Sequence, residues 1–432
     1  MQFMLVMDDT VVNVALPSIR ADLGFDTPGL VWVVNAYFLA FGGLLLLFGR
    51  LADLLGRRRV FLTGVALFGL ASLLGGIAQE PWQMVAGRFA QGAGAAMAAP
   101  AALSLITLMF PAPAERATAL SIWGGIAALG ATMGLVISGA LTDLLSWRWI
   151  FLINLPVAAA ALILVPGLVA ESRADNRPRM DVPGAVLGTA AVFALVYGLL
   201  RTGEVGWGDA TVLGAMALAM VLVIAFLVVE SRATAPLVPA AFLRVRVRAV
   251  ADGATLVFSA AAYTMAFLLM IQLQTALDYS PLVAGLAYLP YGAGILTGMW
   301  LSARVVRWIG MRWAITWSFV AGGVGLALLA GIAPGDDYAS GVLPGMLVTS
   351  VATGLVLPML ATAAMAGTTE RDAGLGSALF TSAQQIGGAV GLALLVSATS
   401  DYAGALGAAA GLLVFGAVLV AALFRAEDAL AP

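Results

Sequence analysis

Long apolar runs, separated by short polar breaks, follow one another along the whole chain. Each run has roughly 18 residues or more, which is enough to cross about 30 Å of hydrocarbon as a helix. The pattern predicts fourteen spanning helices and no strands, hence an all-α membrane protein. The spans are expected at about 1–19, 30–48, 60–79, 83–109, 117–141, 148–169, 182–200, 211–229, 250–272, 282–303, 312–332, 341–364, 374–399 and 404–424.

The densest polar break is GRLADLLGRRR, from Gly49 to Arg59, between the second and third predicted spans. Four arginines and one aspartate so close together must lie in water. A fainter copy follows about 254 positions later, where Gly310 takes the place of Gly56 among Arg304, Arg307 and Arg312. The chain is therefore expected to contain two related halves.

A second pair of similar segments supports this duplication. PAERATALSIW, from Pro111, is similar to TERDAGLGSALF, from Thr369, at an offset of about 255. We predict a six-helix bundle over 1–170, a linker with two additional helices over 171–249, a second six-helix bundle over 250–424 and a cytoplasmic tail over 425–432. At this offset the first span lacks several residues at its start, and we expect no cleaved signal peptide.

The composition removes several kinds of chemistry. The chain is 62% hydrophobic and only 10% charged, whereas soluble proteins carry about 25% charged residues. It has no Cys, no His and no Lys, so disulfides, thiolate or imidazole metal sites and histidine proton relays are absent. Any proton transfer must use a carboxylate. We expect no metal, no cofactor, no nucleic-acid partner and no enzymatic activity.

The arginines are distributed unevenly between the two sides of the predicted membrane. Only Arg20, Arg148 and Arg201 fall on the side opposite to Gly49, and Arg88 lies inside a span. Basic residues accumulate on the cytoplasmic side, so both termini are predicted to be cytoplasmic in a plasma membrane protein. The arginines on the Gly49 side are Arg50, Arg57, Arg58, Arg59, Arg116, Arg173, Arg177, Arg179, Arg232, Arg244, Arg246, Arg248, Arg304, Arg307, Arg312, Arg371 and Arg425.

Several motifs resemble the major facilitator superfamily, and within it the fourteen-span drug:proton antiporters of the EmrB/QacA kind. The resemblance covers essentially the whole chain and implies two six-helix halves with two extra helices between them, alternating access and multidrug efflux driven by protons. The motifs that carry it are MDDTVVNVALPSI (7–19), GRLADLLGRRR (49–59), RFAQGAGAA (88–96), WRWIFLINLP (147–156) and AQQIGGAVG (383–391).

The fifth span departs from the antiporter pattern. The family has G-x-x-x-G-P-x-x-G-G there, and this chain has GATMGLVISG, with Leu135 for the proline and Ser138 for a glycine. Gly130, Gly134 and Gly139 remain, and small residues allow neighbouring helices to approach closely. The missing proline leaves the direction and tightness of coupling open.

Asp8 and Arg88 are the candidates for proton coupling. Both lie inside spans, where an ionised side chain costs about 2.5 to 3.5 kcal/mol on insertion scales. Desolvation favours the uncharged acid, so Asp8 is able to hold a proton. The depths of the two residues allow an ion pair. The sequence leaves open whether that pair breaks during transport or is a permanent structural contact that includes Gln91.

The Gly49 loop is a candidate gate. By resemblance, Gly49, Asp53, Gly56, Arg57 and Arg58 belong to it, with Asp53 and Arg57 acting in gating. Asp53 is able to accept from backbone N–H groups at a helix start or to pair with arginines. Arg57 to Arg59 also serve simply to orient the helix pair.

A substrate cavity is expected between the halves near the membrane midplane. A single deep acid fits a hydrophobic, neutral or monocationic substrate, and we expect a monomer. The alternatives are a facilitator or importer that is not an antiporter, or a lipid-translocating member of the same fold. The candidate lining residues are Asn13, Asn35, Tyr37, Gln91, Trp123, Tyr263, Gln272, Tyr288, Tyr291, Gln384 and Gln385.

Overall fold

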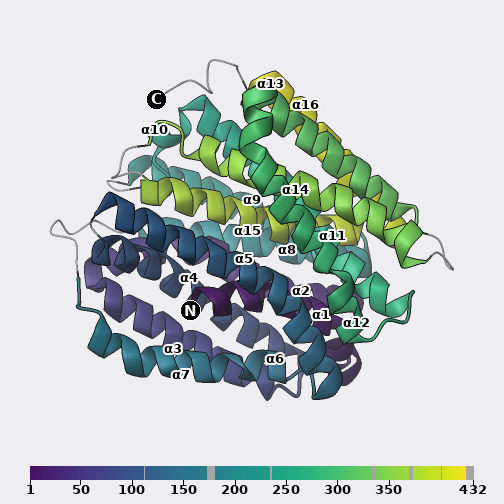
Figure 1. The fold of residues 1–432 in the computed structure, drawn as a ribbon, viewed down its shortest axis with the longest axis horizontal. Coiled ribbons are helices and arrows are strands. Elements are labelled where there is room, and N and C mark those ends of the chain that lie inside the picture. The colour runs from purple at the N-terminus through teal and green to yellow at the C-terminus, as the bar shows by residue number, and fades with distance from the viewer. Residues whose placement is uncertain are drawn as a thin grey trace. The chain divides into compact units, whose positions relative to one another are not determined.

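The computed structural model of the chain is built from helices (Figure 1). It describes residues 1–110, 112–172, 181–233, 236–332, 337–368, 373–399 and 401–424, and no strand occurs among them. The predicted all-α class is confirmed. The elements are α1 (Gln2–Leu23), α2 (Thr27–Leu55), α3 (Arg57–Gly76), α4 (Pro81–Met109), α5 (Pro113–Leu144), α6 (Trp149–Leu152), α7 (Asn154–Leu168), α8 (Val182–Val205), α9 (Ala210–Arg232), α10 (Ala240–Leu243), α11 (Arg246–Thr275), α12 (Pro281–Ala287), α13 (Leu289–Ala330), η1 (Tyr338–Val342), α14 (Leu343–Ala364), α15 (Ala373–Ala398) and α16 (Tyr402–Leu423).

The predicted polar break of eleven residues is much shorter in the structure. Gly56 is the one residue between α2 and α3, with φ 114° and ψ 128°. Gly310 interrupts α13 in the same manner, with φ 77° and ψ 157°. Only glycine adopts a positive φ readily, so each break depends on its glycine. The charged residues on either side belong to the two helices, because α2 extends to Leu55 and α3 begins at Arg57.

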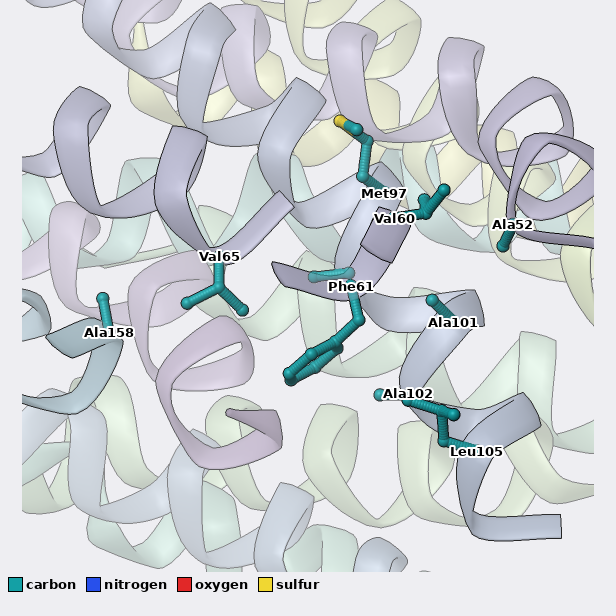
Figure 2. Packing of buried hydrophobic residues seen from close by; sticks show 10 residues of the cluster. Ala52, Val60, Phe61, Val65, Met97, Ala101, Ala102, Leu105 and Ala158 are labelled. Atoms are coloured by element: carbon teal, nitrogen blue, oxygen red, sulfur yellow. The ribbon is translucent and has the colours of Figure 1, made fainter. Parts of the chain in front are cut away.

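The chain divides into two compact units. Unit 1 comprises Met1–Ala191, Val221–Leu237 and Asp278–Leu286. Within it α1 packs against α5, α2 against α4, and α3 against both α4 and α7. A core between α2, α3, α4 and α7 is filled by small and branched side chains around Phe61 (Figure 2). Its buried members are Ala52, Val60, Phe61, Val65, Met97, Ala98, Ala101, Ala102, Leu105 and Ala158.

Unit 2 comprises Val192–Met220, Val238–Leu277 and Ala287–Pro432. Within it α11 packs against α15, and α13 packs against α14 and α16. Taking the two parts of α13 on either side of Gly310 as counterparts of α2 and α3, these pairs repeat those of unit 1. The internal repeat therefore exists in the packing as well as in the sequence.

Eleven helical stretches of the described residues are long and apolar enough to cross a membrane. One of them, Pro281–Ala330, has 50 residues, which is about twice what one span needs. The break at Gly310 falls inside it, as the predicted spans 282–303 and 312–332 require. Helices α1 and α5, with 22 and 32 residues, lie outside these eleven. The total of fourteen spans stays a prediction.

Candidate functional site

Asp8 of α1 and Arg88 of α4 form an ion pair inside unit 1. Arg88 Nη1 lies 2.6 Å from Asp8 Oδ2, and the side chains are 1% and 0% exposed. The structure thus brings together the two residues that the sequence selected for proton coupling. A pair as buried as this one is stable only when its remaining donors and acceptors are also satisfied.

The rest of the Arg88 side chain is held by groups from α2 and α4. Its Nε donates to the Val33 carbonyl at 2.9 Å, and its Nη1 also donates to Gln91 Oε1 at 2.9 Å. The guanidinium carbon lies 4.5 Å from the centre of the Tyr37 ring, a cation–π distance. These contacts fix the direction in which Arg88 points.

The second oxygen of Asp8 also receives donors. Oδ1 accepts from Gln91 Nε2 and from Asn154 Nδ2, each at 3.0 Å. Among the described residues, three side chains hydrogen-bond the Asp8 carboxyl group and each donates to it, which is the arrangement that a carboxylate needs. A protonated Asp8 would place an O–H among donors. One of the partners would therefore have to rearrange to accept from that O–H.

Ser72 of α3 closes the network. Its Oγ accepts from Gln91 Nε2 at 2.8 Å and from Asn154 Nδ2 at 3.4 Å. Asn154 Oδ1 is buried and has no hydrogen-bond partner in the part of the chain that the structure describes. We call Asp8, Arg88, Gln91, Ser72 and Asn154 the polar network. It draws one or more residues from α1, α3, α4 and α7.

Asn154 stands at the start of α7, separated by one residue from Leu152, where the short helix α6 ends. Ile153 between them has helical dihedral angles, φ −62° and ψ −20°, so the predicted sixth span continues through this point. The start of this region is fastened to the end of α1, because Arg148 Nη1 lies 2.5 Å from Asp22 Oδ2.

Gly130, Gly134 and Gly139 of α5 lie against backbone or side chains of neighbouring helices. A Cβ at Gly130 would lie 3.0 Å from the Phe3 carbonyl oxygen, and one at Gly134 would lie 2.6 Å from Thr10 Oγ1. At Gly139 the nearest atom would be the Pro281 carbonyl oxygen, at 2.5 Å. The α5 residue Ser138, where the family pattern has glycine, donates to the Val11 carbonyl of α1 at 2.5 Å. Helices α1 and α5 are thus in close contact beside Asp8.

The candidate gating loop is held by Glu171, which the sequence did not single out. The backbone N–H groups of Arg58 and Arg59 donate to its carboxylate at 3.1 and 3.2 Å, and Arg57 N donates to the Ser172 carbonyl at 3.0 Å. A carboxylate at a helix N-terminus satisfies free N–H groups and the helix dipole. The side chain of Asp53, expected in such a role, lies outside the described residues. A Cβ at Gly49 would lie 3.7 Å from Pro100, in ordinary contact.

The predicted cavity residues are distributed over both units. In unit 1, Gln91 and Tyr37 belong to or border the polar network, Asn35 is fully buried, Asn13 is half-buried and Trp123 packs on the core of Figure 2. In unit 2, the Tyr288 and Tyr291 rings lie 5.5 Å apart and Tyr291 Oη lies 3.5 Å from Thr353 Oγ1. The remaining unit 2 candidates are Tyr263, which contacts Gly388, half-buried Gln272 and Gln384, and buried Gln385. Their role as a cavity lining stays a prediction.

The chain matches the model of the Major Facilitator Superfamily over residues 1–392. It belongs to that superfamily. Among curated proteins, it is 40% identical over 411 residues to the puromycin resistance protein pur8 of Streptomyces alboniger, covering 93% of this chain and 81% of that one. It is 39% identical over 407 residues to the cephamycin export protein CmcT of Amycolatopsis lactamdurans, covering 92% and 83%.

Solved structures show the same fold. An auto-inhibited peptide transporter of the POT family aligns with a TM-score of 0.74 at 15% identity, covering 100% of this chain and 98% of the other. The predicted major facilitator fold is confirmed. The chain is a multi-pass membrane protein of a transporter family, and its curated relatives are drug resistance and export proteins.

Sequence reasoning missed two members of the polar network. Asn154 stands in the WRWIFLINLP motif, which supported the family resemblance without a role for this residue. Its signal was available: a lone amide in an apolar run must find a partner when it is buried. Ser72 has no comparable signal, because serine side chains in helices usually bond their own backbone.

Proposed function

We propose that this chain exports hydrophobic, drug-like compounds from the cytoplasm in exchange for protons, as a member of the drug:proton antiporter branch. The observation that carries the proposal is the buried Asp8–Arg88 pair, in which three donors surround one carboxyl group. The resistance and export functions in the names of the related proteins support the export direction. The proposed substrate is neutral or monocationic, because one deep acid compensates at most one charge.

Proton uptake at Asp8 would weaken the pair. The attraction between Arg88 and a neutral acid lacks the charge–charge part, which is large in a dry interior. Arg88 then interacts more strongly with the Val33 carbonyl, Gln91 and Tyr37, and the conformation with an intact pair loses its advantage. A proton that binds one conformation better than another shifts the balance between them. Each proton carried through 100 mV provides about 2.3 kcal/mol, roughly a fortyfold substrate gradient.

The proposed location is the plasma membrane with both termini in the cytoplasm. The uneven distribution of arginines supports this orientation, because basic residues stay on the cytoplasmic side. The proton gradient across that membrane would drive the exchange, without a cofactor and with a monomer as the working unit.

The test uses everted membrane vesicles that are acidified inside. A panel of hydrophobic neutral and monocationic drugs, beginning with puromycin, is added while a pH-sensitive dye reports proton release from the vesicle interior. We expect release with the unmodified protein and only background release with Asp8→Asn. Asp22→Asn is the matched control, because it removes an exposed carboxylate from the same helix, and it should leave release unchanged.

Two results would contradict the proposal. Equal proton release from Asp8→Asn, with folding intact by its elution profile in detergent, would remove Asp8 from the mechanism. Drug transport that persists unchanged with a protonophore would favour the facilitator alternative.

A further inference from the structure

Asn154 differs from the other members of the polar network in having one unused hydrogen-bonding group. Its Nδ2 donates to Asp8 Oδ1 at 3.0 Å and to Ser72 Oγ at 3.4 Å. Its Oδ1 is buried and accepts from no described residue. An unpaired buried oxygen of this kind is unfavourable, and in a native structure it calls for a physical reason.

Gln91, the other amide of the network, is fully used. Its Oε1 accepts from Arg88 at 2.9 Å, and its Nε2 donates to Asp8 at 3.0 Å and to Ser72 at 2.8 Å. If this amide turned over, its NH2 group would face the donors of Arg88. Gln91 is therefore fixed as long as Arg88 is in place, whereas Asn154 can turn without breaking a contact of its oxygen.

We propose that Asn154 is a positioning residue whose side-chain amide turns over when Asp8 takes up a proton. The inference rests on the proposed function, since it needs Asp8 to be the proton carrier. With Asp8 ionised, Nδ2 donates to the carboxylate, as observed. With the proton on Asp8 Oδ1, the turned amide presents its oxygen, which accepts from the Asp8 O–H and from the Ser72 hydroxyl.

Among the described neighbours of Asp8, Asn154 is the residue best placed to accept a hydrogen bond from the protonated acid. Among the described side chains that contact Asp8, Arg88 from α4 is the one charged group, and Gln91 and Asn154 are amides. From α5, the neighbouring groups are glycines and Ser138, whose hydroxyl is bound to the Val11 carbonyl. From α2, the Tyr37 ring lies on Arg88. Asn154 is thus the contact of Asp8 that is able to act as donor in one state and acceptor in the other.

After the turn of the Asn154 amide, the two oxygens of Asp8 would have different roles. Oδ1 takes the proton and faces Asn154, while Oδ2 still faces Arg88 at the observed 2.6 Å. The ion pair then loses its charge–charge attraction, while the new O–H of Asp8 has an acceptor. The turn moves the unpaired position of Asn154 from its oxygen to its NH2 group, so Asp8 itself keeps bonded partners in both protonation states.

Infrared difference spectroscopy tests the turn directly, on the full chain in lipid, with asparagine labelled by carbon-13 at the side-chain carbonyl. We expect acidification to produce the carbonyl band of protonated Asp8 together with a shift of a labelled amide band to lower frequency, as a free carbonyl becomes hydrogen-bonded. Both changes should share one pH midpoint and vanish in Asp8→Asn. Asn154→Leu should abolish the amide shift.

Asn154→Thr is a second variant in case Asn154→Leu does not fold. The threonine hydroxyl is able both to donate a hydrogen bond and to accept one. It should keep the Asp8 band and lose the amide shift. An Asp8 band without any amide shift in the unmodified protein would overturn the turning of Asn154 and leave the proposed function standing. Absence of an Asp8 band at every pH, with the protein folded, would overturn both.

Discussion

The interiors of the two units hold their polar groups in different ways. In unit 1 an ion pair, two amides and a serine bond one another across four helices. In unit 2 four buried threonine hydroxyls bond the carbonyl four residues earlier in their own helix, at 2.7 to 2.8 Å. These hydroxyls belong to Thr255, Thr264, Thr349 and Thr353.

The repeat makes the difference informative. About 254 positions after Asp8, Arg88 and Gln91, the chain has Ala262, Val342 and Gly345. Unit 2 nevertheless repeats the helix pairs of unit 1. A polar group at these three positions is therefore not needed to form the helix pairs, and the presence of Asp8, Arg88 and Gln91 in unit 1 points to a task other than folding.

Unit 2 does hold a half-buried carboxylate, that of Asp252 in the second turn of α11. Its Oδ1 is buried and has no hydrogen-bond partner among the described residues. The contrast between the units is thus one of depth and pairing.

The largest effect is expected from breaking the ion pair. Arg88→Met leaves Asp8 buried without its cationic partner, which costs about 3 to 5 kcal/mol for pairs of this kind. Thermal unfolding in detergent measures the loss. The double variant Asp8→Asn with Arg88→Met should be more stable than Arg88→Met alone, because no unpaired charge remains.

Thr264→Val is the matched change in unit 2. It removes a buried hydroxyl that bonds only the Ala260 carbonyl, at 2.7 Å, and should cost about 1 kcal/mol or less. A loss as large as that of Arg88→Met would show that the two interiors do not differ in the manner described.

Backbone packing should respond alike in both units. A Cβ at Gly139 would lie 2.5 Å from the Pro281 carbonyl oxygen, and one at Gly391 would lie 2.2 Å from Ala260 Cβ. Alanine at either position should destabilise by about 1 to 3 kcal/mol through overpacking. Gly125→Ala, on α5 with nothing within 4 Å, is the control and should be neutral or stabilising by up to about 1 kcal/mol. If alanine at Gly139 and at Gly391 destabilised the protein unequally, the two units would share the order of their helices but not the closeness of their helix packing.

The two single-residue breaks allow a finer comparison. Alanine at Gly56 or Gly310 must adopt a positive φ with an extended ψ, a combination that residues other than glycine rarely adopt, at a cost of about 1 to 3 kcal/mol. At Gly56 the new Cβ would also lie 2.6 Å from Glu171 Oε1, whereas nothing lies within 4 Å at Gly310. Gly56→Ala should therefore be the more destabilising, by chemical denaturation. Adding Glu171→Ala should reduce the difference, and a difference that persists would argue against the Glu171 contact as its cause.

The smallest effect concerns the exposed pair of Asp22 and Arg148. The hydrogen bond from Arg148 lowers the pKa of Asp22 below its usual value. A lowered pKa in the folded state adds stability above the unfolded pKa of about 4, and this is lost as the pH falls through the folded value. Because Asp22 is 45% exposed, the contribution is well below about 1 kcal/mol. Asp22→Asn should leave the unfolding temperature unchanged between pH 8 and 5 to within a degree or two, and a large loss there would show that the pair is more important than its exposure suggests.

The helices could be predicted from the sequence because apolar length is set locally along the chain. Two repeated segments indicated the duplication, and the motifs resembled those of the superfamily. The sequence also placed Asp8 and Arg88 together, since two charges in hydrocarbon have few alternatives. It could not predict that Asn154 bonds Asp8, 146 residues away, because only the packing of α7 on α3 decides which side chains α7 meets. The sequence also could not predict that the break at Gly56 has only one residue. The polar residues before Gly56 fit an exposed helix face as well as they fit a loop.

A connection of one residue between two helices allows them little independent movement. The helices α2 and α3 are joined through Gly56 alone, and peptide planes are rigid, so their mutual tilt changes almost entirely through the two backbone dihedral angles of that glycine. Gly56 is therefore the hinge through which a rotation of α2 moves α3. Gly310 connects the two parts of α13 in the same way. Force applied to one helix of such a pair reaches the other without a loop to absorb it.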